Sequence, residues 1–209
     1  MSTLRALILA AGEGTRMKSD VPKVLHTICG RPMIAYALDL AAAAGVKQPI
    51  VVLGHGADAV KPHLPKEAKI VMQAKAAGTA DAVLSAKRAL GGLLGDLLIL
   101  YADTPLLRRT TVQHLIESHF KHEATATLLS AHLANPTGYG RIVRDATGLI
   151  TAVVEENEAH AAQRAIREIN VGTLVGKAQP LMDSLAAVTP AGGKKELYLT
   201  QAITHLARQ

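Results

Sequence analysis

The sequence predicts an α/β fold: a Rossmann-like mixed sheet, mostly parallel, with helices on both faces and a β-richer lobe in the second half. Short apolar runs alternate with longer segments whose apolar residues recur at helical spacing, which is typical of repeated βαβ units. The run Leu97–Tyr101 is apolar without alternation, as expected of a strand buried on both faces of a parallel sheet. After Ala124 strands follow one another around turn residues, which favours antiparallel pairing.

The first strand is expected at Leu4–Ala10, where only Arg5 interrupts the apolar run, and it ends at a glycine-containing loop. Pro32 is expected just inside the start of the next helix, and Gly45 follows the end of that helix. The remaining elements expected before residue 124 are strands at 50–53, 69–73 and 97–101, and helices at 33–44, 57–64, 78–90 and 110–122.

The second half is expected to hold strands at 124–132, 141–144, 149–155 and 167–175, followed by helices at 179–187 and 197–207. No internal repeat, low-complexity tract or linker interrupts the chain. We therefore expect one domain, with about residues 1–122 as its α/β part and about residues 123–209 as the β-richer lobe with the closing helices.

Composition narrows the class of protein. Hydrophobic residues make up 49% of the 209 residues but aromatic residues only 2%, so the core must be aliphatic and stacking platforms for single-stranded nucleic acid are not expected. The formal charge of +6 favours an anionic ligand. Because the lysines and arginines are scattered along the chain, we expect no nucleic-acid partner.

Two further features indicate the compartment. The single cysteine, Cys29, cannot form an internal disulfide, which suits a reducing cytoplasm, and we expect it to pack as a small side chain. No leader opens the chain and no apolar run of about 20 residues occurs, so we expect a cytoplasmic protein without a membrane partner. His114, His119 and His122 are expected to be solvated helix residues, because they form no evident metal cluster.

The loop Ala11–Arg16 is the strongest chemical signal. Gly12 and Gly14 allow a ligand to approach the main chain, whose successive N–H groups suit an anion. Arg16 and Lys23 add cationic side chains close by, which favours phosphate. The loop lacks the Gly-Lys-Ser/Thr of a Walker loop, and Met17 stands where a Rossmann fingerprint needs its third glycine. An ordinary turn with solvated charges remains the alternative.

Two other segments are expected beside this loop. Asp103 directly follows the most apolar strand, where a carboxylate suits Mg²⁺, although capping of the turn before Pro105 is the alternative. Gln73 offers a donor and an acceptor that match the edge of a pyrimidine, and Gly78-Thr79 opens the next helix. The alternative is a strand end and a helix start without ligand contacts.

The string Leu-Ala-Ala-Gly-x-Gly-Thr-Arg-Met, followed by Pro22-Lys23-Val24-Leu25, resembles the signature of sugar-nucleotide pyrophosphorylases. More narrowly, it resembles uridylyltransferase domains that make UDP-N-acetylglucosamine and pyrophosphate from UTP and N-acetylglucosamine 1-phosphate. The resemblance implies catalytic roles for Arg16 and Lys23, Mg²⁺ as the cofactor on Asp103, and UTP and a sugar 1-phosphate as partners. It also implies a set of nucleotide-binding residues, namely Leu9, Ala10, Ala11, Gly12, Gly14, Gln73, Gly78 and Thr79.

The sugar is expected in the β-richer lobe. The segment Thr137–Ile142 resembles the family's Thr-Gly-Tyr-Gly-Arg-Ile, and the resemblance implies that Gly140, Glu155 and Asn170 bind the sugar. A solvated strand end for Glu155 and a turn role for Asn170 are the alternatives.

The chain also departs from the family pattern. Asp81 stands where the family usually has His, Glu156-Asn157 replaces part of a His-Lys-Asp run, and Val171 and Gln201 replace Thr and Asp. The family's second metal ligand, an Asn, and its acetyltransferase β-helix would lie beyond Gln209, so neither is expected here. A related nucleotidyltransferase with another sugar or nucleotide, a non-catalytic nucleotide-sugar binding module, and a homo-oligomeric state all remain open.

Overall fold

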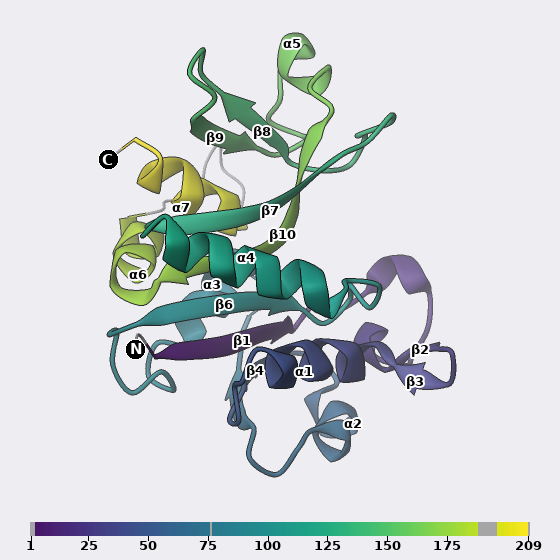
Figure 1. Cartoon of the computed structure of the whole chain (residues 1–209). Coiled ribbons are helices and arrows are strands. Elements are labelled where there is room, and N and C mark those ends of the chain that lie inside the picture. The colour runs from purple at the N-terminus through teal and green to yellow at the C-terminus, as the bar shows by residue number, and fades with distance from the viewer. Residues whose placement is uncertain (1–2, 76, 188–195, 209) are drawn as a thin grey trace.

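The computed structural model describes residues 3–75, 77–187 and 196–208, and its principal feature is one eight-stranded sheet (Figure 1). The strand order is β5-β4-β1-β6-β10-β8-β9, and β7 also pairs with β10. The strands are β1 (Leu4–Ala10), β4 (Ile50–Leu53), β5 (Lys69–Met72), β6 (Asp96–Tyr101), β7 (Ala126–His132), β8 (Arg141–Arg144), β9 (Ile150–Val154) and β10 (Glu168–Lys177). The first four run parallel, whereas β10 is antiparallel to β6, β7 and β8. The predicted mixed sheet is confirmed.

Helices cover both faces of this sheet, as predicted. They are α1 (Met33–Ala43), α2 (Ala57–Val60), α3 (Thr79–Ser85), α4 (Arg109–Lys121), α5 (Ala161–Arg164), α6 (Ala178–Ala187) and α7 (Leu199–Leu206), with short 3-10 turns η1 (Thr15–Met17), η2 (Lys23–Leu25) and η3 (Lys61–His63). Buried residues of α1, α2 and α4 form one core, and those of α3, α6 and α7 form the other. In Figure 1 the β8–β9 hairpin and α5 form the upper lobe, to which the long strand β10 leads.

The central strand β1 shows why the sheet is buried on both sides. Leu7 and Leu9 point to the core beneath α3, α6 and α7, whereas Ala6 and Ile8 point to the core beneath α1 and α4. The charged interruption, Arg5, is also accounted for, because its guanidinium donates to three main-chain carbonyls of the segment that precedes β6. Local sequence and packing therefore agree along this strand.

A small hairpin was not predicted. Strands β2 (Thr27–Ile28) and β3 (Arg31–Pro32) pair around Cys29 and Gly30, whose φ angles of 49° and 76° are those of a tight two-residue turn. Cys29 is exposed in this turn, so the predicted packing role was wrong. Two-residue strands are too short to produce a periodic pattern, and the same holds for the four-residue helix α5, which was also missed.

The prediction that His119 is solvated was wrong. Its side chain is only 1% exposed, and its two ring nitrogens lie 3.1 Å from Asp96 Oδ1 and 3.0 Å from Thr127 Oγ1. The physical reason is helical spacing, because Val112, Leu115 and His119 share the face of α4 that packs on the sheet. His114 and His122 are exposed, as expected.

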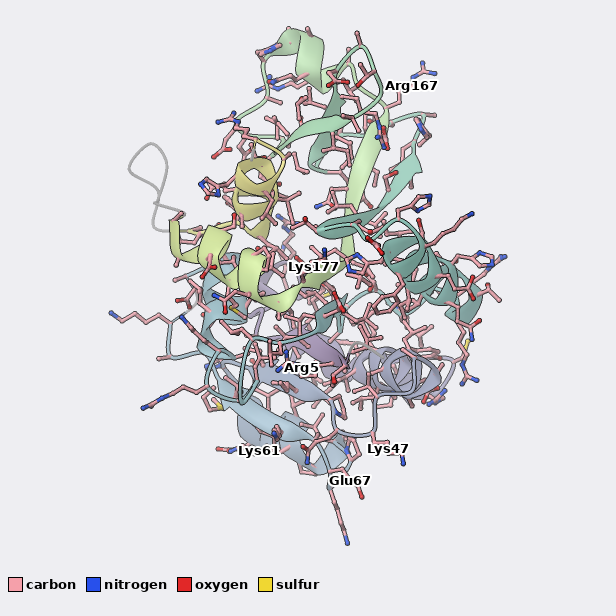
Figure 2. The ribbon with its side chains drawn as sticks, turned by 60° about the vertical axis from the view of Figure 1, so that its left-hand side comes forward. Arg5, Lys47, Lys61, Glu67, Arg167 and Lys177 are labelled. Carbon is pink, nitrogen blue, oxygen red and sulfur yellow. The ribbon has the colours of Figure 1, made fainter. Side chains whose placement is uncertain are left out.

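The charged side chains are spread over the molecule. Figure 2 shows Arg167 near the upper end and Lys47, Lys61 and Glu67 near the lower end. None of the helices in the described part of the chain is long and apolar enough to cross a membrane.

Candidate functional site

A cavity of about 410 Å³ opens beyond the carboxyl ends of β1 and β6. In parallel α/β sheets this edge is where ligands bind. The cavity is lined by Leu9, Ala10, Ala11, Gly12, Glu13, Gly14, Thr15, Lys23, Val24, Gln73, Gly78, Thr79, Ala82, Tyr101, Asp103, Glu196 and Tyr198. The structure therefore brings together all eight predicted nucleotide-binding residues, with Lys23 and Asp103 in the same wall.

The glycine loop Ala11–Arg16 packs against the side chain of Lys23. Gly14 has φ +65°, and a Cβ built on it would lie 2.6 Å from Lys23 Cβ, so only glycine allows Lys23 to pack against the loop. Among the described residues, no heavy atom lies within 4 Å of a Cβ position on Gly12, which leaves its main chain open to the cavity. After Gly14 the chain turns into η1, where Arg16 is exposed and lies outside the residues that line the cavity.

Lys23 and Asp103 form an ion pair in the cavity wall. Lys23 Nζ lies 2.5 Å from Asp103 Oδ2, and the two side chains are 35% and 33% exposed. Lys23 is placed by η2, which begins directly after Pro22, and Asp103 is placed by the end of β6, where the Ala102 amide donates to the Leu9 carbonyl at 3.0 Å. A phosphate in the cavity would therefore meet a cation and a carboxylate held side by side.

The donor set around Asp103 is suited to Mg²⁺. Its carboxylate supplies hard oxygen ligands, and the described residues include no group of three or more His, Cys, Asp and Glu side chains able to hold a metal. Mg²⁺ typically takes one or two carboxylates and completes its shell with phosphate oxygens and water. A single carboxylate that lines the cavity fits this requirement. A tetrahedral zinc site needs three or four protein ligands, which the described residues do not group here.

Gln73 directly follows β5 and lines the cavity. It is 8% exposed, and its Nε2 donates to the Gly78 carbonyl at 3.1 Å and to Asp81 Oδ2 at 2.8 Å. A second cavity of about 380 Å³, at the ends of β4 and β5, shares Ala11, Glu13 and Gln73 with the first. The cleft thus continues across the carboxyl ends of all four parallel strands.

The segment Gly78–Thr79 is held by the C-terminal part of the chain. A Cβ on Gly78 would lie 2.4 Å from the Leu197 carbonyl oxygen, and Thr79 Oγ1 accepts a hydrogen bond from the Leu199 amide at 2.9 Å. The absence of a side chain at Gly78 is thus required by the contact with Leu197. This contact brings Glu196 and Tyr198 into the cavity wall.

Two tyrosines in this wall were not predicted. Burial raises the pKa of Tyr101 above its ordinary value, and the ring packs against Gly172, whose Cβ would lie 2.9 Å from Tyr101 Cε2. A hydrogen bond to Glu196, 2.6 Å long, is the main cause that raises the pKa of Tyr198 to about 12. Both phenols stay neutral near pH 7, and the single O–H of Tyr198 is the donor to Glu196. A polar tip at the end of the apolar strand was the one sequence signal for Tyr101.

The predicted sugar-binding residues lie together, but outside the residues that line the cavity. The main-chain N–H of Asn170 donates to the Gly140 carbonyl at 2.8 Å. A Cβ on Gly140 would lie 3.6 Å from both carboxylate oxygens of Glu155. Glu155 accepts a hydrogen bond from Thr200 Oγ1 at 2.7 Å, so it is not a solvated strand end. Asn170 Oδ1 accepts from the Gly172 amide at 3.1 Å, which joins this group to the ring of Tyr101.

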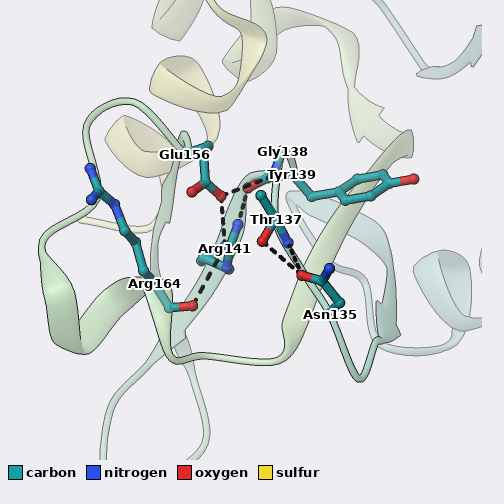
Figure 3. A network of polar contacts seen from close by, with 7 residues as sticks. All are labelled: Asn135, Thr137, Gly138, Tyr139, Arg141, Glu156 and Arg164. Carbon is teal, nitrogen blue, oxygen red and sulfur yellow. Dashed lines mark hydrogen bonds and ion pairs between the residues drawn. The ribbon is translucent and has the colours of Figure 1, made fainter.

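A buried arginine supports the loop that carries Gly140 (Figure 3). Arg141 is 1% exposed, and its guanidinium donates to Glu156 Oε2 at 2.7 Å and to the main-chain carbonyls of Tyr139 and Arg164. Glu156 Oε2 also accepts from the Gly138 amide at 3.0 Å. The Arg141–Glu156 ion pair thus holds residues 138–140 from one side, and the exposed ring of Tyr139 lies on the other side.

Comparison with known proteins places the chain among nucleotide-processing domains. The model of the MobA-like NTP transferase domain matches residues 6–194. The bifunctional protein GlmU of Pelotomaculum thermopropionicum is 46% identical over 200 residues, which cover 96% of this chain and 44% of that protein. The GlmU of Enterococcus faecalis is 39% identical over 209 residues, 100% of this chain and 46% of that protein. The chain thus spans a little less than half the length of these curated relatives.

The fold is shared with proteins of much lower identity. A crystal structure of UDP-glucose pyrophosphorylase complexed with UDP-glucose has a TM-score of 0.83 and 18% identity, covering 100% of this chain and 88% of that one. At this identity the likeness establishes the fold alone. The resemblance inferred from the motifs is confirmed by the GlmU relatives, which match nearly the whole chain. The chain therefore belongs to the family of MobA-like NTP transferase domains.

Proposed function

We propose that the chain is a uridylyltransferase that joins UTP to N-acetylglucosamine 1-phosphate and releases UDP-N-acetylglucosamine and pyrophosphate. The observation that carries this proposal is the cavity in which the open glycine main chain faces the Lys23–Asp103 pair. The name of the GlmU relatives and their identity over nearly all of this chain support the choice of reaction. A cytoplasmic location, where both substrates would be available, belongs to the same proposal.

The reaction needs positioning and charge neutralisation more than covalent catalysis. An oxygen of the sugar 1-phosphate would attack the α-phosphorus of UTP in line, and the bond to the bridging oxygen of the β-phosphate would break, so that pyrophosphate leaves. Lys23 would contact the two reacting phosphates, and Arg16 would fold over the departing pyrophosphate from the mouth of the cavity. The main chain at Gly12 and Gly14 would bind the triphosphate.

Asp103 is the residue that would hold Mg²⁺, which would neutralise phosphate charge when bound. Lys23 donates to one of the Asp103 oxygens, so this ion pair would keep the carboxylate oriented towards the cavity. Gln73 would contact the base. Tyr101 would lie between nucleotide and sugar, since its ring joins the cavity to the Gly140–Glu155–Asn170 group.

The proposal is tested by pyrophosphate release with a panel of UTP, CTP, GTP and dTTP and with N-acetylglucosamine 1-phosphate or glucose 1-phosphate. We expect turnover only when Mg²⁺ is present and highest with UTP and the amino sugar. Lys23→Ala and Arg16→Ala should each lower kcat by at least about 10²-fold, the scale of losing one fixed charge donor. Lys66→Ala, an exposed lysine outside the cavity, should leave kcat unchanged.

Two results would contradict the proposal. Unchanged kcat in Lys23→Ala would remove its catalytic basis. Calorimetry that shows UDP-sugar binding without any Mg²⁺-dependent turnover would indicate a non-catalytic binding module instead.

A further inference from the structure

The orientation of the Gln73 amide is decided by its neighbours. One atom of that amide contacts both the Gly78 carbonyl, at 3.1 Å, and Asp81 Oδ2, at 2.8 Å. Because a carbonyl and a carboxylate can only accept, that atom must be the NH₂ group. The Gly78 carbonyl is itself held by the Ala82 amide at 3.1 Å, so it is a fixed acceptor.

The other end of the amide faces the cleft. Gln73 Oε1 accepts no hydrogen bond from the described residues. This oxygen is also not fully buried, so water or a ligand can reach it. Gln73 lines both cavities of the cleft. The side chain therefore presents an acceptor, and no donor, to whatever occupies the cleft.

An acceptor in this place distinguishes two pyrimidines. The N3 atom of uracil carries a hydrogen and donates, whereas the N3 atom of cytosine has a lone pair and can only accept. A glutamine at this position that could turn its amide freely would pair with the N3 atom of either base. A site that holds one orientation penalises the base that leaves its acceptor unpaired.

We propose that Asp81 is a positioning residue that sets base selectivity, by fixing the Gln73 amide so that only its oxygen faces the base. The inference rests on the proposed function, because it assumes that the cleft binds the nucleotide. Asp81 lies in the first turn of α3 and is hydrogen-bonded to Gln73, through which it would act on the base. Its carboxylate can accept but never donate, so together with the Gly78 carbonyl it excludes the turned amide, in which oxygen would face oxygen at both contacts.

The experiment measures the dissociation constants of UTP and CTP by calorimetry with Mg²⁺ present, for the wild type and two variants. Asp81→Asn keeps the shape but can pair with either end of the Gln73 amide. Its preference for UTP over CTP should fall at least about tenfold, the scale of one hydrogen bond to a charged group. Asp81→Ala, which leaves Gly78 as the sole acceptor, should shift the preference in the same direction.

The chain offers a matched control. On α6, Gln179 Nε2 donates to Asp183 at 2.8 Å and 2.9 Å in an exposed pair of the same chemistry. Asp183→Asn should leave both dissociation constants unchanged. Thermal unfolding of each variant establishes that it is folded.

Each outcome has one meaning. A folded Asp81→Asn protein with the wild-type preference would overturn the inference, and so would a wild type that binds UTP and CTP equally. Turnover is measured separately: a selective protein that depends on Asp81 but releases no pyrophosphate would refute the proposed function and leave this inference standing.

Discussion

Replacing Gly14 with alanine tests whether the glycine loop and Lys23 form one unit. Gly14 has φ +65°, where an L-residue costs about 1–2 kcal/mol. The added Cβ would lie 2.6 Å from Lys23 Cβ. Because carbon atoms pack at about 3.5 Å or more, either the loop or Lys23 must move by about 1 Å. A displacement of that size in a catalytic group can cost about 10²-fold in rate.

The assay is kcat/KM by pyrophosphate release, together with thermal unfolding. Gly30→Ala is the matched control, because Gly30 has φ +76° but no heavy atom of the residues that the structure describes lies within 4 Å of its Cβ position. Gly30→Ala should lower Tm by a few degrees and leave kcat/KM unchanged, whereas Gly14→Ala should lower Tm similarly and kcat/KM by about 10²-fold. Wild-type kcat/KM in Gly14→Ala, or an equal loss in both variants, would refute the reasoning.

Three further predictions concern stability and the lobe. Hydrogen bonds from Arg144 are the main cause that lowers the pKa of Glu168 from 4.5 to about 2, so the ionised carboxylate adds at most about 3 kcal/mol to the free energy of unfolding above pH 4.5, and this stability is lost as the pH falls towards 2. Measured by urea unfolding, Glu168→Gln should therefore lose less stability than the wild type between about pH 6 and pH 3. An equal loss of stability in both proteins would argue against this role of Glu168. Glu156→Gln removes the charge that faces buried Arg141, and we expect the KM for the sugar phosphate to rise roughly threefold to tenfold while the KM for UTP stays constant. Parallel changes in the two KM values would contradict a role confined to the loop that carries Gly140. His119→Leu should destabilise the fold by about 2–3 kcal/mol in urea, because the buried Asp96 carboxylate and the half-buried Thr127 hydroxyl each lose a partner. It should leave kcat/KM unchanged, since the His119 contact with β6 is at the end opposite the cavity.

The sequence by itself determined the order and type of nearly all the longer elements. Apolar runs and helical spacing are local properties, and they predicted β1, β4 and β6 with bounds that the structure matches to within one residue. The glycine loop and Asp103 were also predicted to meet, because the carboxyl ends of parallel strands share one edge of a sheet. Helix α3 ended earlier than predicted, at Ser85, since its last residues form turns.

Only the tertiary structure decided the contacts between residues that are distant in the sequence. Lys23 and Asp103 are 80 residues apart, and the Thr79–Leu199 hydrogen bond, which brings Tyr198 and Glu196 to the cavity, spans 120 residues. Periodicity reports which face of an element is apolar, but it carries no information about which polar groups a neighbouring element will offer. For this reason the burial of His119 and the fixed amide of Gln73 appear only once the chain is folded.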